Sequence, residues 1–223
     1  MDILFRILSI FIGYAFGCLQ FAYFIGKFAG NIDIREHGSG NAGMTNVTRT
    51  MGLKFGGAVF ILDIMKAMAA FFVATLVFGN VGDMFSGTAV FGIYAGLGAI
   101  LGHNFPFFMK FRGGKGVSCT AGVIIAFDWR VALVLFVISL ATLIITRYIS
   151  VVSLTIAVAF PLVMVIYHFF FNFANYRLET IMLAIIIGAL CWIKHKDNII
   201  RLVNGTERKV KSKKEPAKGK GKK

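Results

Sequence analysis

The sequence is poor in charge. Charged residues make up 15% of its 223 positions and only 10 residues are acidic, whereas hydrophobic residues make up 57% and the mean hydropathy is +0.77. A soluble domain carries about 25% charged residues. A chain with so few charges cannot cover a globular surface, so lipid must be its solvent. The composition therefore excludes a soluble enzyme, a disordered protein and a secreted domain held together by disulfides.

Cysteines are also few and form no recognisable motif. Cys18, Cys119 and Cys191 lie in or beside apolar stretches, without a C-x-x-C pair or a metal-type spacing to histidine. We interpret them as small buried hydrophobic residues. The sequence also lacks H-E-x-x-H, a paired-carboxylate site and a D-x-x-D cluster, so we expect neither a metal nor a cofactor.

Long apolar stretches dominate what is present. A membrane-spanning helix needs about 20 apolar residues, and the candidate spans are 3–26, 55–78, 86–104, 117–127, 131–146, 152–172 and 178–193. The fourth is weak, because a helix of that length extends only about 17 Å against a hydrocarbon core of roughly 30 Å. The predicted fold class is an all-α integral membrane protein, a bundle of seven transmembrane helices.

Positive charge is distributed unevenly between the connecting segments. Segments 27–54, 105–116, 147–151 and 194–223 hold 20 of the 24 Lys and Arg residues, and the opposite set holds three. Cytoplasmic loops carry such an excess, which predicts an N-terminus outside and a C-terminus in the cytoplasm. If the fourth span did not cross, the basic C-terminal segment would face outside, so the count favours seven crossings.

The C-terminal end differs from the rest of the chain. We expect residues 1–207 to form the membrane domain and residues 208–223 to form a lysine-rich cytoplasmic tail, disordered and attracted to anionic lipid headgroups. The tail has no aromatic or base-reading pattern, so we do not expect it to bind nucleic acid. We expect a monomer.

Polar residues gather in three clusters on the side predicted to be cytoplasmic. The first cluster, residues 38–49, combines small residues that let an anion approach the backbone with Arg49, which can bind a phosphate through two hydrogen bonds. Its G-x-G-x-x-G spelling does not indicate a dinucleotide site, because a membrane helix precedes it instead of a strand. A flexible loop without a ligand is the alternative. The neutral hydrogen-bonding side chains are Ser39, Asn41, Thr45 and Asn46.

The second cluster is residues 102–120. Gly113, Gly114 and Gly116 surround Lys115, and successive backbone N–H groups that open a helix beside a lysine form an anion-binding nest. This is not a Walker A loop, because glycine instead of Ser or Thr follows the lysine. His103 in the same cluster is a base or, as we favour, a hydrogen-bonded structural histidine.

The third cluster is divided between Ser153, early in the sixth span, and His195, Asn198 and Glu207 after the seventh. His195 and Asn198 share a helix face and can point toward the mouth of the bundle. The alternative is a solvated amphipathic helix on the membrane surface. Together the clusters indicate a phosphorylated substrate bound at the cytoplasmic face.

Charged residues also occur within a predicted span. Asp63 and Lys66 are three positions apart on one helix face. An unpaired charge at that depth costs several kcal/mol, so we expect the two to pair. A structural pair and a functional role are both compatible with this pattern.

These motifs resemble those of the bacterial acyl-phosphate:glycerol-3-phosphate acyltransferases of the PlsY type, over the chain to about Lys209. The resemblance depends on several ordered motifs, which together are highly specific. They are G-S-G-N-x-G-x-T-N…R at 38–49, D-x-x-K at 63–66, G-H-N-F-P…K-F-x-G-G-K-G-V at 102–117, Y-x-S-x-x-S at 148–153 and H-x-x-N-I-x-R-L-x-x-G-T-E at 195–207. Departures such as Ala42, where the family usually has proline, remove no charged or nucleophilic candidate.

The resemblance implies a seven-span enzyme of the bacterial cytoplasmic (inner) membrane. It would transfer a fatty acyl group from acyl phosphate to the sn-1 hydroxyl of glycerol 3-phosphate, which gives lysophosphatidate, the first step of phospholipid synthesis. From the motifs and the resemblance together we predict as catalytic Ser39, Arg49, His195 and Asn198. We predict as phosphate-binding Gly113, Gly114, Lys115, Ser153, Asn41, Thr45 and Asn46. We predict as structural Asp63, Lys66, His103 and Glu207.

Acyl phosphate is already activated, so such an enzyme has mainly to position two anions that repel each other. Our hypothesis is direct attack of the hydroxyl without an acyl-enzyme, with His195 or a substrate phosphate oxygen taking the proton. A transporter of a small phosphorylated anion is the first alternative, although we find no internal repeat of the kind transporters have. A non-catalytic membrane scaffold is the second, and it leaves the glycine-lysine loop unexplained.

Overall fold

The computed structural model describes residues 2–79, 89–170 and 178–210, and every regular element in these ranges is helical. The prediction of an all-α fold is confirmed. The α-helices are α1 (Asp2–Gly17), α2 (Phe21–Gly30), α3 (Met44–Met51), α4 (Leu53–Phe78), α5 (Val90–Asn104), α6 (Val117–Phe127), α7 (Trp129–Thr146), α8 (Ile149–Phe170), α9 (Leu178–Lys194) and α10 (Lys196–Val203). Two short 3-10 helices are η1 (Ile34–Glu36) and η3 (Phe107–Met109).

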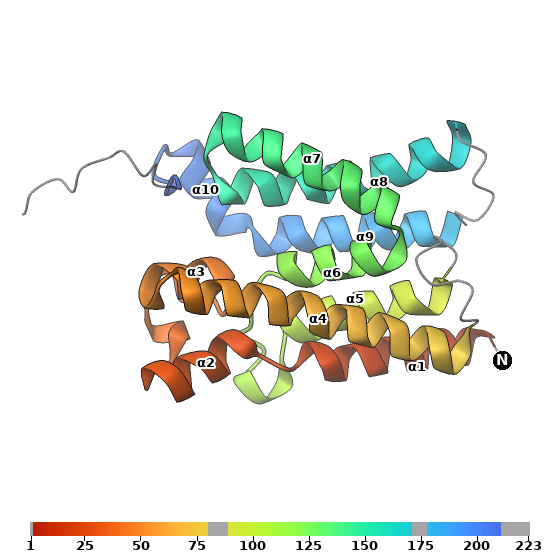
Figure 1. Ribbon diagram of the computed structural model, residues 1–223, viewed down its shortest axis with the longest axis horizontal. Coiled ribbons are helices and arrows are strands. Elements are labelled where there is room, and N and C mark those ends of the chain that lie inside the picture. The colour runs from red at the N-terminus through yellow and green to blue at the C-terminus, as the bar shows by residue number, and fades with distance from the viewer. Residues whose placement is uncertain (1, 80–88, 171–177, 211–223) are drawn as a thin grey trace, which may run out of the picture.

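The long helices form two groups that lie side by side (Figure 1). One group contains α1, α4 and α5, and the other contains α7, α8 and α9. Helix α6 packs against α4 and α5 on one side and α7 on the other, and α5 also contacts α9, so these helices join the groups. The buried core along the seam includes Phe71, Phe127 and Phe160. The short helices α3 and α10 both lie at the end of the molecule opposite the N-terminus.

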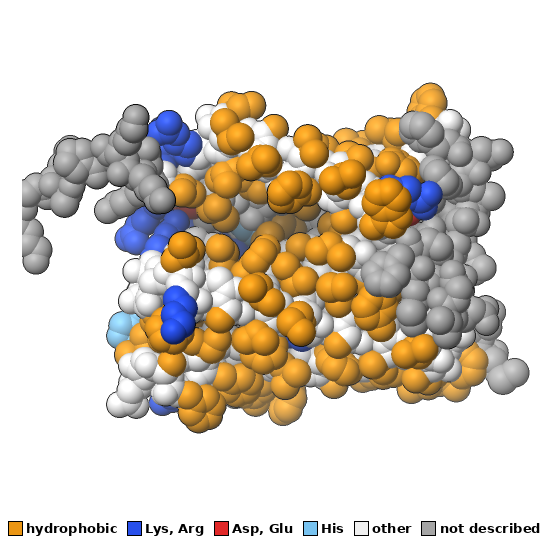
Figure 2. Space-filling view, in the orientation of Figure 1, with side chains coloured by type: hydrophobic (Ala, Val, Ile, Leu, Met, Phe, Trp, Pro, Cys, Tyr) orange, Lys and Arg blue, Asp and Glu red, His pale blue; other side chains and the backbone are white. Residues whose placement is uncertain are grey.

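The outer surface of the bundle is apolar. Figure 2 shows hydrophobic side chains along the length of the helices, with most of the visible Lys and Arg at the end that carries α3 and α10. On α7, for example, Phe136 and Ile144 are more than 60% exposed. Large exposed apolar side chains over the whole length of a helix are stable only against lipid. The distribution fits an integral membrane protein.

The described helices include five that are long and apolar enough to cross a membrane, and α9 with α10, bent by 59°, makes a sixth. Helix α6 begins and ends where the sequence predicted, at Val117 and Phe127, and is too short to qualify alone. The predicted count of seven crossings and the orientation of the termini stay predictions. Residues 86–88 and 171–172 of two predicted spans lie outside the described residues.

The first predicted span, 3–26, is confirmed as a candidate span, although its helix is interrupted at Cys18–Gln20 between α1 and α2. A break inside an apolar stretch exposes carbonyl groups that need partners. Lys66 Nζ donates to Leu19 O (2.6 Å) and Gln20 Nε2 donates to Gly17 O (3.1 Å). Charged and amide groups from inside the bundle therefore stabilise the break, and α1 with α2 still qualifies as one candidate span, Ile3–Gly30.

A polar contact joins the two groups at the end that carries the N-terminus. Arg6 of α1 pairs with Glu179 of α9 through two hydrogen bonds of 2.5 and 2.9 Å. Tyr94 of α5 donates to the same carboxylate at 2.7 Å. Three helices from both groups are thereby held together at the end of the molecule opposite α3 and α10.

The predicted tail begins with ordered residues. Val210 N donates to Arg147 O (2.8 Å), and Lys209 Nζ lies 5.4 Å from the ring centre of Tyr148. Residues 211–223 of the predicted tail lie outside the described residues.

Candidate active site

The turn between α9 and α10 directs two predicted site residues into the protein. The 59° bend falls at His195, which is 3% exposed, and Asn198 on the first turn of α10 is 8% exposed. Ile200 and Val203 occupy the opposite, exposed side of α10. The prediction that His195 and Asn198 face inward is therefore confirmed. The alternative, in which both side chains are solvated on the membrane surface, is excluded by their burial.

Asn198 is the centre of a hydrogen-bonded group that links the second and third clusters. Its Oδ1 accepts from Lys115 Nζ, and its Nδ2 donates to Glu207 Oε1 (2.9 Å). Arg201 Nε donates to the other oxygen of Glu207 (2.7 Å). Glu207 thus holds Asn198 and Arg201 in place, which agrees with a structural function.

The charges of this group perturb one another. Burial and, to a smaller extent, the nearby Arg201 lower the pKa of Lys115 to about 8, while Glu207 opposes the shift. Burial raises the pKa of Glu207, but hydrogen bonds from Arg201 and Asn198 outweigh it and hold that pKa below its usual value. Two cations and one carboxylate leave this group with an excess of positive charge, as a phosphate site requires.

The glycine-rich loop rests on the end of α5. Gly113 N donates to Asn104 O (3.3 Å) and Gly114 N donates to His103 O (3.0 Å). Gly116 caps α6 with φ 77°, a left-handed conformation that favours glycine. The loop therefore presents Lys115 directly before the first free N–H groups of α6, which is the arrangement predicted for an anion-binding nest.

The first cluster is a loop held by one buried asparagine. Asn46, 1% exposed, accepts from Ser39 N (2.8 Å) and donates to Ile34 O (3.0 Å) and His37 O (2.9 Å). The side-chain amide of Asn46 is therefore fully engaged in hydrogen bonds within the protein. Ser39 and Arg49 are exposed, whereas Asn41 and Thr45 are half-buried at the start of α3.

The first cluster lies against the other two. A Cβ added to Gly114 would approach Ala42 O to 2.7 Å, so the backbones of the first and second clusters are in contact. Partial burial and the charge of Arg208 lower the pKa of Arg49, and Glu207 raises it, which places Arg49 within electrostatic reach of the third cluster. The structure brings together the three clusters that the sequence separates.

His195 and Ser153 meet on either side of Cys191. His195 Nδ1 lies 2.8 Å from Cys191 O, and Cys191 Sγ donates to Ser153 O (3.6 Å). A carbonyl only accepts, so Nδ1 carries the proton and the neutral ring keeps a lone pair on Nε2. Ser153 Oγ donates to Ile149 O (3.0 Å) within α8. His195 can therefore accept a proton through Nε2.

A narrow, mainly apolar cavity begins at this point. Ser153, Cys191 and Thr120 line it together with apolar residues farther along α8 and α9, among them Ala157, Phe160 and Ile187. It lies between α6, α8 and α9 and so follows the seam between the two helix groups. The cavity is small in this structure, and its lining is mostly apolar.

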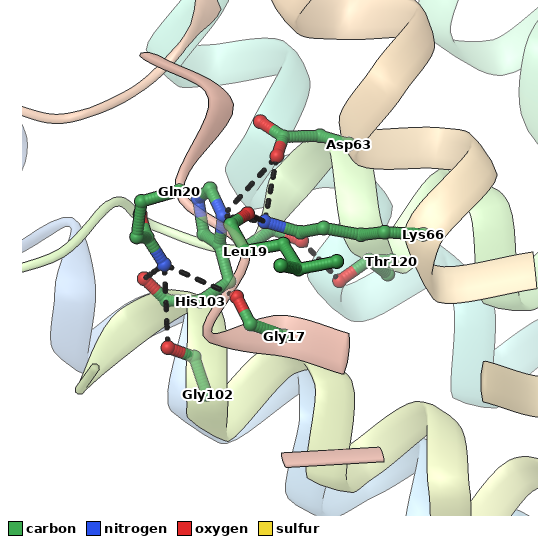
Figure 3. A network of polar contacts seen from close by, with 9 residues as sticks. Gly17, Leu19, Gln20, Asp63, Lys66, Gly102, His103 and Thr120 are labelled. Atoms are coloured by element: carbon green, nitrogen blue, oxygen red, sulfur yellow. Dashed lines mark hydrogen bonds and ion pairs between the residues drawn. The ribbon is translucent and has the colours of Figure 1, made fainter. Parts of the chain in front are cut away.

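Figure 3 shows the buried network around Asp63 and Lys66. The predicted pair is confirmed, with Lys66 Nζ 2.7 Å from Asp63 Oδ1, and Lys66 Nζ also lies 3.0 Å from His103 Nδ1. Gln20 Nε2 donates to the carbonyls of Gly17, Gly102 (3.3 Å) and His103 (3.2 Å). The network joins the break after α1 to the end of α5, directly beneath the glycine-rich loop.

Among the described residues, one set of side chains has the spacing of metal ligands: Asp63, His103 and Cys119, with ligand atoms within 4.8 Å of one another. The ammonium group of Lys66 contacts both the carboxylate and the imidazole of this set. The protein thus supplies its own cation here, so the donor set does not fit a metal ion.

Sequence patterns do not identify two buried polar residues of this region, Gln20 and Asn104. Gln20 lies within a predicted apolar span, and a single amide there gives no periodic signal. Asn104 forms part of the G-H-N-F-P motif, but its spelling alone does not reveal how its side chain is placed. Both are 0% exposed.

These observations define a class of protein: a helical membrane protein with a cationic, glycine-rich site at one end. The family model described as glycerol-3-phosphate acyltransferase matches residues 7–205. The glycerol-3-phosphate acyltransferase of Thermoanaerobacter sp. (strain X514) is 37% identical over 212 residues, 95% of this chain and 99% of that protein. That of Thermosipho melanesiensis is 42% identical over 206 residues, 92% of each chain.

Two solved structures are similar to this chain over most of its length. The crystal structure of PlsY (YgiH), an integral membrane glycerol 3-phosphate acyltransferase, in its glycerol 3-phosphate form superposes with a TM-score of 0.80 at 34% identity, over 92% of this chain and 96% of that one. Its lysophosphatidic acid form gives a TM-score of 0.78 at the same identity, over 92% and 95%. The chain belongs to the glycerol-3-phosphate acyltransferase family.

Proposed function

We propose that this membrane-bound acyltransferase transfers a fatty acyl group from acyl phosphate to the sn-1 hydroxyl of glycerol 3-phosphate, releasing lysophosphatidate and phosphate. The observation that carries the proposal is the contact of Lys115, in the glycine-rich loop, with Asn198, in the last motif, beside the free N–H groups of α6. The relatives' names and the two substrate- and product-bound forms of PlsY support the same reaction.

Phosphate binding is assigned to the cationic end of the site. Lys115 and the free N–H groups at the start of α6 take the phosphate of glycerol 3-phosphate, and exposed Arg49 takes the phosphate of the donor. Gly113 and Gly114, whose N–H groups donate to Asn104 O and His103 O, shape the loop that places Lys115 there. Ser39, Asn41 and Thr45 supply neutral donors beside Arg49, whereas Asn46 holds their loop. The cations and N–H groups of the site offset the mutual repulsion of the two anions, and holding both substrates in one site removes most of the entropic barrier to their encounter.

The chemical step is direct acyl transfer. The sn-1 oxygen attacks the carbonyl carbon, a new C–O bond forms, and the carbon–oxygen bond to phosphate breaks with its electron pair leaving on phosphate. The hydroxyl proton passes to His195 Nε2, which is left with a lone pair by the hydrogen bond of Nδ1 to Cys191 O. Asn198 and Ser153 line the same site, and no covalent acyl-enzyme forms.

The acyl chain is assigned to the apolar cavity between α6, α8 and α9. The cavity begins beside Ser153 and Cys191, next to His195, so a chain within it places its carbonyl at the polar end. The chain packs against apolar side chains and gains binding energy without a polar contact.

The membrane arrangement proposed is seven crossings in the bacterial inner membrane, with α6 as the short fourth span, the N-terminus outside and the site in the cytoplasm. We further propose a monomer whose lysine-rich tail contacts anionic headgroups. Single cysteines tested with an impermeant maleimide separate the arrangements. Lys54→Cys and Arg147→Cys should react only from the cytoplasmic side and Trp129→Cys only from outside. Labelling of positions 54 and 129 from the same side would contradict a crossing by α6.

The reaction is tested with purified protein, labelled glycerol 3-phosphate, and either palmitoyl phosphate or palmitoyl-CoA. We expect lysophosphatidate from palmitoyl phosphate alone, and a loss of about 100-fold in kcat/KM for Lys115→Ala, since a hydrogen bond to a charged group contributes about 1.5–3 kcal/mol. Exposed Lys54→Ala is the matched control and should behave as the parent. If sealed vesicles that contain the protein take up the label and no lipid product forms, the protein is a transporter and the proposed acyl transfer is wrong.

A further inference from the structure

The side chain of Asn104 is the feature that the proposed site leaves unexplained. Asn104 ends α5 and is 0% exposed. Neither its Oδ1 nor its Nδ2 has a hydrogen-bond partner among the described residues. An amide that is buried without partners destabilises a protein, so residues of this kind are found where a ligand or a change of state uses them.

The backbone of Asn104 is fully engaged, in contrast to its side chain. Its carbonyl accepts from Gly113 N (3.3 Å) and from Lys194 Nζ (3.2 Å). The residue is therefore fixed in position at the base of the glycine-rich loop. Only the amide remains able to turn about its last side-chain bond and present either its oxygen or its NH2 group.

The amide lies beside the start of α6. A Cβ added to Gly116, the residue that caps α6, would lie 2.9 Å from Asn104 Oδ1. Gly116 follows Lys115 directly, and the first N–H groups of α6 have no partner within their own helix. An unpaired amide and the residue after Lys115 thus meet at the N-terminus of α6, and amide, lysine and helix N–H groups all bind phosphate oxygens well.

We propose that Asn104 is a further binding residue of the glycerol-3-phosphate site, where its Nδ2 donates to a phosphate oxygen at the start of α6. The inference rests on the proposed assignment of the glycine-rich loop to that phosphate. Asn104 adds a neutral hydrogen-bond donor to the site. The hydrogen bond from Gly113 N to its carbonyl fixes its position relative to the glycine-rich loop.

Gln20 offers a matched control, because it is a second fully buried amide in the same region. Its Nε2 already donates to three carbonyl groups, at Gly17, Gly102 and His103. Removing the amide of Gln20 breaks bonds within the protein, whereas removing the amide of Asn104 breaks none. The two substitutions therefore separate a structural amide from one that serves a ligand.

The test compares Asn104→Leu, Asn104→Asp and Gln20→Leu in the full-length protein. For Asn104→Leu we expect an unchanged or higher Tm without substrate and a KM for glycerol 3-phosphate raised about tenfold or more. The KM for palmitoyl phosphate should stay within about twofold of the parent. Asn104→Asp should raise the first KM further, because its carboxylate repels phosphate. Inorganic phosphate should raise the Tm of the parent protein and not that of Asn104→Leu.

Gln20→Leu should show the reverse, a lower Tm with both KM values unchanged. Three outcomes would overturn the inference: an unchanged KM for glycerol 3-phosphate in both Asn104 variants, an equal rise of both KM values, or failure of the Asn104 variants to fold. The last outcome would mean that the amide is needed by the fold. If Lys115→Ala leaves the KM for glycerol 3-phosphate unchanged, the assignment of the loop is itself wrong, which is a separate result.

Discussion

At the scale of single residues, the protonation of Lys115 controls the site. Burial lowers its pKa to about 8, so the side chain is a cation at neutral pH and loses its proton as the pH rises through about 8. A neutral amine cannot balance the charge of a phosphate. The site is thus set to work just below the pH at which it would lose one of its charges.

We therefore expect the KM for glycerol 3-phosphate to rise as the pH increases from 7 to 9.5, with the midpoint near the pKa of Lys115. Lys115→Arg should bind more weakly but keep a flat profile, because a guanidinium stays protonated throughout this range. The measurement is a steady-state titration of glycerol 3-phosphate at each pH with palmitoyl phosphate saturating. A parallel rise in the arginine variant would assign the titration to another group.

Glu207 illustrates a residue that acts through its neighbours. Its lowered pKa means that the folded protein favours the carboxylate, so this group stabilises the fold above about pH 4.5 and the contribution is lost as the pH falls below that value. Glu207→Gln should lower the Tm and kcat/KM at pH 7. The difference in Tm should shrink toward pH 4. A Tm difference that is independent of pH would exclude the ionised carboxylate as its source.

The residue scale also shows what spacing can and cannot predict. His195 and Asn198 were placed on one inward face because three residues along a helix bring side chains to the same side. The motif predicts phosphate binding by Asn46, whereas in the structure its amide accepts from Ser39 N and donates to the carbonyls of Ile34 and His37. Hydrogen bonds of an irregular loop depend on the path of its backbone, and residue types do not specify that path.

At the scale of elements, the glycine-rich loop depends on close backbone contact. A methyl group at Gly114 would collide with the ring of His103 and the carbonyl of Ala42, so Gly114→Ala must displace the loop. We expect a KM for glycerol 3-phosphate raised about tenfold or more, as for the loss of a charged hydrogen bond. Gly57→Ala is the control, because a Cβ there meets no atom within 4 Å. The measurement is the KM for glycerol 3-phosphate of both variants, with Tm as a check on folding. Equal KM values in the two variants would contradict the prediction.

The interruption of the first span at Cys18–Gln20 is the feature of an element that the sequence does not reveal. Residues 3–26 contain no proline and a single charged residue, Arg6 near the start, so hydropathy predicts one helix. The break at Cys18–Gln20 is stabilised by Lys66, 47 positions from Leu19, and by the amide of Gln20. Hydropathy describes a segment alone, and a break that depends on a distant partner is invisible to it. Helix α6 was correctly bounded because glycine precedes it and Asp128 follows it in the sequence.

At the scale of the whole molecule, the two helix groups are joined at both ends by different chemistry. One end has the contact between Lys115 and Asn198, and the other has Arg6, Tyr94 and Glu179. Composition predicts a membrane protein, because too little charge leaves lipid as the solvent, and the length of the apolar stretches predicts that it is helical. The pairing of the groups was not predictable, since it depends on side chains more than 170 positions apart, such as Arg6 and Glu179.

Arg6→Ala tests the far contact. We expect a decrease of about 2–3 kcal/mol in stability from the loss of two charged hydrogen bonds, seen as a Tm lower by several degrees. The KM values should not change, because the three polar clusters lie at the other end. Glu179→Gln keeps the volume and part of the hydrogen bonding, so its effect should be smaller. A change of KM without a change of Tm would place this contact in the site's own machinery.

The bend at His195 has a consequence for how the enzyme fails. Helix α10 reaches the glycine-rich loop only through this turn, so a small sliding of one helix group along the other separates Asn198 from Lys115 while every helix stays intact. Inactivation by heat or detergent should therefore precede the loss of helical signal. Preparations that still appear folded by circular dichroism will contain inactive molecules, and turnover is the more sensitive gauge of intact protein.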